Sequence, residues 1–169
     1  MEFWVIDTSS ITEVRRIVPA DRQVAVYAGL TELVVKEVLV FPKQVVGELR
    51  NYTGSPKNKP DLPYDWATKN EGLATRFGFS AASLRKVLSH SLARRVVDPD
   101  KSGAEEADPY VLELGIRLKE QGHEVTILTE DRKDKPEKIS LHTAASILRL
   151  VPLGVEAFLE VQNIWNKRT

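Results

Sequence analysis

Cysteine is absent from the 169 residues of this chain, so no disulfide bond, thiolate nucleophile or cysteine-ligated zinc site can form. No apolar run approaches the ~20 residues that a membrane-spanning helix needs. The first residues also lack the basic segment and the long apolar stretch of a secretory signal. These absences favour a cytoplasmic protein.

An excess of either charge is absent as well, because 24 lysine and arginine residues balance 24 acidic ones. A protein whose whole surface binds nucleic acid typically has a pI above about 9, which disfavours that class. The charges are unevenly spread, however: residues 50–101 hold ten basic and five acidic residues, a net charge of +5. A basic middle between acidic ends suits separate surfaces for phosphate and for metal, although on charge alone ordinary scatter of surface charge is the preferred explanation.

Short apolar runs that alternate with helical patterns predict one α/β domain over residues 1–169, with a central parallel sheet and helices on both faces. The expected strands are residues 3–6, 38–41, 124–128 and 150–152. The expected helices are residues 8–18, 21–37, a segment that begins at Pro42, and 66–77, 80–93, 109–121, 140–149 and 153–165. Residues 53–63 hold one glycine and three prolines among polar residues, and they predict a surface loop.

Four acids stand at positions where a site could form. Asp7 and Asp131 follow the first and third expected strands, and ligands of parallel sheets bind beyond the carboxyl ends of the strands. Asp7 could instead cap a helix and Asp131 could lie in a turn. Glu48 could be a solvated charge in mid-helix, and Asp108, just before Pro109, could be a helix cap. Acids held close together repel, so at least one of them is expected to have a raised pKa.

Sequence motifs of several other enzyme classes are missing. His90, His123 and His142 are scattered without paired spacing, and the chain has neither a phosphate-binding glycine loop nor a nucleophile elbow. Phosphatases of the haloacid-dehalogenase type need a second aspartate two residues after the first, where this chain has Ser9.

Four segments in order resemble those of PIN-domain nucleases. They are FWVIDTSSITE at residues 3–13, VVGELR at 45–50, EADPYVLELG at 106–115 and VTILTED at 125–131. The resemblance implies a PIN-like three-layer fold with Asp7, Glu48, Asp108 and Asp131 as catalytic residues and ligands of Mg²⁺ or Mn²⁺, the hard cations that carboxylates suit. The supporting residues that it implies are Thr8, Ser9, Thr129, Glu105, Glu130 and Asp134. Ser9 departs from the asparagine of many members, and which of Glu130, Asp131 and Asp134 faces the site stays open.

The activity implied by the resemblance is hydrolysis of RNA phosphodiester bonds by a metal-dependent endoribonuclease. The small size is similar to VapC-like toxin ribonucleases of toxin–antitoxin pairs, which implies a cognate antitoxin protein and a homodimer. Lys57, Lys59, Tyr64 and Trp66 around the proline-rich loop are candidates for RNA binding, although the aromatic residues could instead pack on a neighbouring helix. The alternatives are a DNA or structure-specific nuclease on the same fold, and a catalytically silent PIN-like module that binds RNA or protein.

Overall fold

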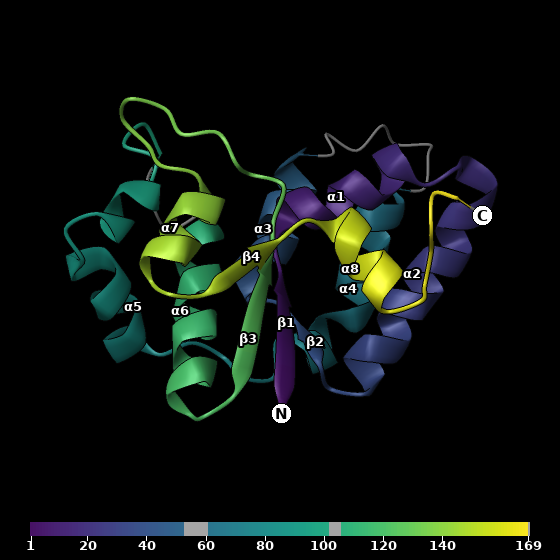
Figure 1. Ribbon diagram of the computed structural model, residues 1–169, viewed down its shortest axis with the longest axis horizontal. Coiled ribbons are helices and arrows are strands. Elements are labelled where there is room, and N and C mark those ends of the chain that lie inside the picture. Colours follow the sequence, from purple (N-terminus) through teal and green to yellow (C-terminus); the bar gives the residue numbers. More distant parts are fainter. Residues whose placement is uncertain (53–60, 102–105, 169) are drawn as a thin grey trace.

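Four parallel strands form a single sheet in the computed structural model, which describes residues 1–52, 61–101 and 106–168. The strands are β1 (Glu2–Ile6), β2 (Leu39–Val40), β3 (Glu124–Leu128) and β4 (Val151–Leu153). Their order across the sheet is β2-β1-β3-β4, and every pairing is parallel, as the sequence predicts (Figure 1). β1 and β3 are therefore the two central strands.

The two central strands pair in register along their whole length, from Glu2 beside Glu124 to Ile6 beside Leu128. Their apolar residues are nearly all buried, which suits strands covered by helices on both faces. The pairing continues one residue further, because the backbone N–H of Asp7 donates to the carbonyl of Leu128 over 3.1 Å. Residues 7 and 129 consequently lie side by side where the two strands end.

Helices cover both faces of the sheet, so the α/β expectation is confirmed. In Figure 1, α5, α6 and α7 lie on one side of the strands, and α1, α2, α4 and α8 lie on the other. The helices found in the described residues are α1 (Thr8–Ile17), α2 (Ala20–Val35), α3 (Lys43–Tyr52), α4 (Leu62–Ala74), α5 (Ala81–Ser89), α6 (Asp108–Glu120), α7 (Leu141–Ile147) and α8 (Val155–Val161), with a 3-10 turn, η1 (Ala93–Val96). None of these helices is long and apolar enough to cross a membrane.

Three helix boundaries differ from the expected ones by four residues, each for a local reason. α4 begins at Leu62 rather than residue 66, because Pro63 fits the first turn of a helix. α5 ends at Ser89 rather than residue 93, and the ring of His90 then accepts the N–H groups of Leu92 and Ala93 that lead into η1. α8 ends four residues early, shortly before Asn163 adopts a left-handed conformation with φ 54°.

At Gly115, α6 approaches β3 closely. A Cβ atom at this position would lie 2.9 Å from Cδ1 of Ile127 and 3.0 Å from Cδ1 of Leu150, both of which are buried. Gly72 in α4 is a helical glycine without this constraint, because a Cβ there would meet nothing within 4 Å.

We predict that Gly115→Val destabilises the protein by about 1–3 kcal/mol, the usual cost of overpacking a core. Gly72→Val, the same change on an open helix surface, should alter the free energy of unfolding by less than about 0.5 kcal/mol. Urea unfolding followed by circular dichroism measures both. Equal effects of the two substitutions would contradict the packing of α6 on β3.

Candidate active site

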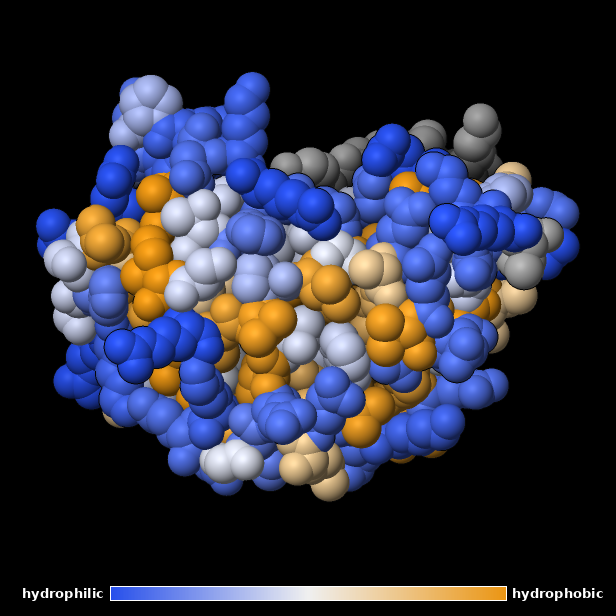
Figure 2. Space-filling model, in the orientation of Figure 1, coloured by the Kyte–Doolittle hydropathy of each residue, from blue (hydrophilic) through white to orange (hydrophobic). Residues whose placement is uncertain are grey.

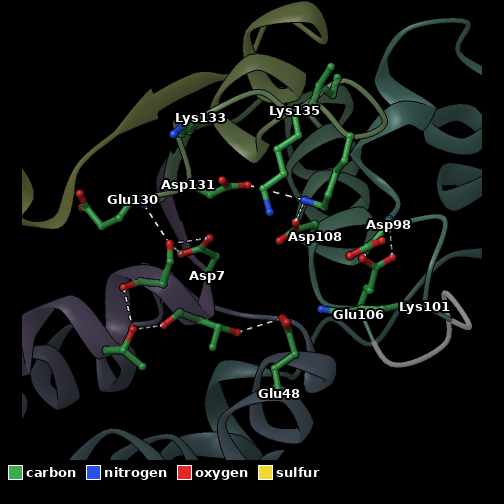
Figure 3. Close-up of a pocket in the computed structure, with 15 residues that line it drawn as sticks. Asp7, Glu48, Asp98, Lys101, Glu106, Asp108, Glu130, Asp131, Lys133 and Lys135 are labelled. Carbon is green, nitrogen blue, oxygen red and sulfur yellow. Dashed lines mark hydrogen bonds and ion pairs between the residues drawn. The ribbon is translucent and has the colours of Figure 1, made fainter. Parts of the chain in front are cut away.

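Four acids from different parts of the chain line one pocket at the carboxyl edge of the sheet. Asp7 follows β1, Glu48 lies in α3, Asp108 is the first residue of α6, and Asp131 lies three residues beyond β3. Figure 3 shows their carboxylates directed into this pocket, which has a volume of about 380 Å³. The surface along this edge of the molecule is hydrophilic (Figure 2). The predicted convergence of the four acids is therefore confirmed as geometry.

Asp7 is the most buried of the four acids, with 3% of its surface exposed. Its carboxylate accepts hydrogen bonds from the hydroxyl of Ser9 at 2.8 Å, the backbone N–H of Ser10 at 2.9 Å and the hydroxyl of Thr129 at 2.8 Å. The bond from Ser10 makes Asp7 the N-cap of α1, so this residue is a helix cap and a pocket residue at the same time. Ser9 and Thr129, two of the predicted supporting residues, fix its orientation.

Burial raises the pKa of Asp7 from 3.8 to about 7, and the negative charge of Asp108 adds to this effect, while the three hydrogen bonds oppose it. Burial followed by the charge of Asp108 also raises the pKa of Glu48. The pKa of Asp108 itself is raised by burial, although the nearby ammonium of Lys138 works in the opposite direction. The acids thus repel one another, as expected from the sequence, and the pocket favours any cation that can neutralise them.

Glu48 faces the pocket and is only partly exposed, so its interpretation as a solvated surface charge is wrong. Its Oε1 atom accepts hydrogen bonds from the hydroxyl of Thr8 and from the backbone N–H of Ala107, each over 3.1 Å. These two contacts join α3 to the start of α1 and to the start of α6. Thr8, another predicted supporting residue, therefore contacts a second acid rather than Asp7.

Asp108 and Asp131 share one positively charged partner. The Nζ atom of Lys138 lies 3.0 Å from Oδ2 of Asp108 and 3.7 Å from Oδ2 of Asp131. Asp108 is the first residue of α6, one position after the N-cap Ala107, and within the described residues its carboxylate accepts no hydrogen bond from this helix, so the capping role considered for it is wrong. The same oxygen of Asp131 also accepts the backbone N–H of Leu141, which holds the loop after β3 against the start of α7.

Of the three acids after β3, Asp131 is the one whose carboxylate faces the site. Asp134 accepts hydrogen bonds from the N–H of Ser140 and the hydroxyl of Thr143, so it stabilises the start of α7 and does not line the pocket. Glu130 lies at the pocket wall, but its Oε1 atom accepts the backbone N–H of Val155 at the start of α8. The supporting roles predicted for Asp134 and Glu130 are thus structural contacts with helices, and Glu105 lies outside the described residues.

Other charged residues of the pocket were not predicted from the sequence. Glu106 is 3% exposed, and both of its carboxylate oxygens accept the backbone N–H of Asp98. The pocket is also lined by four lysines: Lys101, Lys133, Lys135 and Lys138. Three of them belong to the segment DRKDKPEK that directly follows Glu130. This dense run of charged residues is the sequence feature that could have indicated them.

Of the four residues predicted to bind RNA, Trp66 is placed where it cannot do so. Trp66 is 5% exposed and packs between Tyr27 and Phe41, with its indole N–H donating to the hydroxyl of Thr31, so it belongs to the core and cannot stack on a base. Tyr64 is partly exposed, and its hydroxyl accepts a hydrogen bond from Arg50. Lys57 and Lys59 lie outside the described residues.

Comparisons with protein-family models, curated proteins and solved structures found no match to this chain.

Carboxylate oxygens are the preferred ligands of Mg²⁺ and Mn²⁺, and the donor set of this pocket fits such an ion. Among residues 1–52, 61–101 and 106–168, no three acidic, histidine or cysteine side chains already stand close enough to hold a metal. Mg²⁺ usually keeps several waters and takes only one or two protein carboxylates, so it does not require such a cluster. Asp7, Glu48, Asp108 and Asp131 are the residues from which its one or two carboxylate ligands would come.

The raised pKa of Asp7 predicts a pH-dependent stability in the presence of a chelator. Between pH 4 and pH 7 the folded protein holds a proton on Asp7 that the unfolded chain has lost, so stability falls as pH rises through this window and then levels off. Asp7→Asn removes this contribution, which is of the order of a few kcal/mol because one pKa unit is about 1.4 kcal/mol.

Urea unfolding at several pH values between 4 and 8, in EDTA, measures the effect. The free energy of unfolding of Asp7→Asn should rise relative to that of the wild type as the pH increases. Asp21→Asn, the same change on an exposed part of α2, should follow the wild type at every pH. Parallel curves for the wild type and Asp7→Asn would show that the Asp7 carboxyl titrates normally.

Proposed function

We propose that this protein is a metal-dependent nuclease with a PIN-like fold that hydrolyses RNA phosphodiester bonds in this pocket. The observation that carries the proposal is that one pocket is lined by side chains of both negative and positive charge. The acids Asp7, Glu48, Asp108 and Asp131 face the lysines Lys101, Lys133, Lys135 and Lys138.

The two sets of charges fit the two parts of a phosphodiester reaction. A pocket lined by carboxylates alone would repel a phosphate group, and one lined by lysines alone would have no ligands for a hard cation. Ammonium groups bind phosphate oxygens as point charges, so the lysines of the wall can hold the backbone of a nucleic acid. The acids beneath them can then hold the cation next to the bound phosphate.

Neighbouring residues hold the acids in place before any substrate arrives. Ser9 and Thr129 hold Asp7, whereas Thr8 and the backbone of Ala107 hold Glu48. When bound, Mg²⁺ or Mn²⁺ would supply Lewis-acid chemistry that activates water and stabilises the leaving oxygen. Groups fixed in this way need little reorganisation during the reaction, which is the usual source of electrostatic catalysis.

The biological setting that we propose comes from the resemblance to VapC-like toxins: a toxin ribonuclease that acts with a cognate antitoxin protein and forms a homodimer. A short antitoxin-like reading frame directly upstream of the coding sequence would support this setting. Co-expression of that frame should block the nuclease activity. An unaffected activity would leave the nuclease proposal in place and remove the toxin–antitoxin setting.

The nuclease proposal predicts that the purified protein cleaves single-stranded RNA with Mg²⁺ or Mn²⁺ and stops when EDTA is added. Asp7→Asn should lower the cleavage rate by at least about 100-fold, the scale of losing one catalytic electrostatic group, because a neutral amide is a weaker ligand of a hard cation. Asp21→Asn should cleave at the wild-type rate. Labelled RNA and DNA of the same sequence, resolved on denaturing gels, provide the measurement.

Several outcomes would change the proposal. Cleavage of DNA in preference to RNA would keep the metal site and reverse the substrate assignment. Full activity of Asp7→Asn, or activity that is indifferent to the chelator, would contradict the mechanism. RNA binding without cleavage would favour a catalytically silent binding module.

A further inference from the structure

Lys138 is the charged partner of two acids in the pocket, and this pairing is built into the fold. Its ammonium lies 3.0 Å from Asp108 and 3.7 Å from Asp131, and its side chain is only 19% exposed. Asp108 comes from the start of α6, whereas Asp131 and Lys138 belong to the segment between β3 and α7. The lysine therefore links two walls of the pocket across its interior.

The backbone around Lys138 is held independently of its side chain. The N–H and carbonyl groups of Lys135 and Lys138 pair with each other over 2.8 and 3.2 Å, which closes a tight turn. The next two N–H groups are also bound, because Ile139 donates to the carbonyl of Arg95 and Ser140 donates to Asp134. A change of the Lys138 side chain should thus leave the turn in place.

The four acids are neutralised unequally. Asp7 and Glu48 accept hydrogen bonds from hydroxyl and backbone N–H groups, which carry no net charge. Within the described residues, the ion pairs formed by the four acids are both with Lys138, and they fall on Asp108 and Asp131. One half of the pocket already has a cation paired with its acids, whereas in the other half the acids contact neutral donors, and the charge of Lys101 acts on Glu48 without forming an ion pair in the described residues.

We propose that Lys138 takes the place of a second metal ion on Asp108 and Asp131, so that the pocket binds a single divalent cation on the side of Asp7 and Glu48. This inference rests on the proposed function, because it describes the metal site of that nuclease. A metal ion bound to the same oxygens, at about 2.1 Å, would stand close to the ammonium, and the two positive charges would repel each other. In the reaction, the ammonium would stay paired with the two acids and would contact a phosphate oxygen at the position where two-metal nucleases use an ion.

The number of bound ions tests this inference without any measurement of activity. The full chain is titrated with Mn²⁺, and electron paramagnetic resonance of the free ion gives the number bound per chain. The wild type should bind one Mn²⁺, and Lys138→Met should bind two. Lys138→Arg, which keeps the positive charge, and Lys133→Met, which removes a lysine that forms no ion pair with the four acids in the described structure, should each bind one.

Each result separates the inference from the function on which it rests. A wild type that binds two ions would overturn the role of Lys138 and leave the nuclease in place, whereas a wild type that binds none would overturn both. One ion bound to Lys138→Met would also contradict the inference, whether its affinity is unchanged or higher, because higher affinity would mean that the lysine competes with the single ion. Lys138→Gln serves as a second neutral variant if circular dichroism shows that the methionine variant is misfolded.

Discussion

The in-register pairing of β1 with β3 is the contact on which the site depends. Because the two strands end at the same level, Asp7 and Thr129 meet at the sheet edge, and the hydrogen bond between them holds the first acid in place. The backbone bond from Asp7 to Leu128 extends the same ladder by one residue. A shift of the pairing by one residue would turn every side chain of a strand to the opposite face and would separate these two residues.

The burial of acidic side chains in the site lowers the stability of the folded protein. Asp7 is buried among polar donors and close to the charge of Asp108, so its ionised form is disfavoured in the folded state. The hydrogen bonds from Ser9, Ser10 and Thr129 offset part of this cost. Strongly perturbed acids in a pocket are typical of functional sites, because a fold selected for stability alone would not assemble them.

Local patterns in the sequence predicted the four strands of the described sheet and the positions of Asp7 and Asp131, because buried parallel strands are short apolar runs and acids at their ends are visible directly. Glu48 and Asp108 could be assigned only through resemblance, since a charge in mid-helix or before a proline has common structural explanations. The partners of the acids were beyond sequence reasoning. Lys138 reaches Asp108 across 30 residues of chain, and Trp66 stands beside a polar loop in the sequence but packs in the core.

The effect of metal on thermal stability tests the central claim, that the acids of this pocket bind a divalent cation beside Asp7, most directly. An ion that binds only the folded state raises the melting temperature. Added Mg²⁺ or Mn²⁺ at neutral pH should therefore raise the melting temperature of the wild type clearly more than that of Asp7→Asn. Equal shifts in the two proteins would contradict this metal site and remove the physical basis of the proposed nuclease.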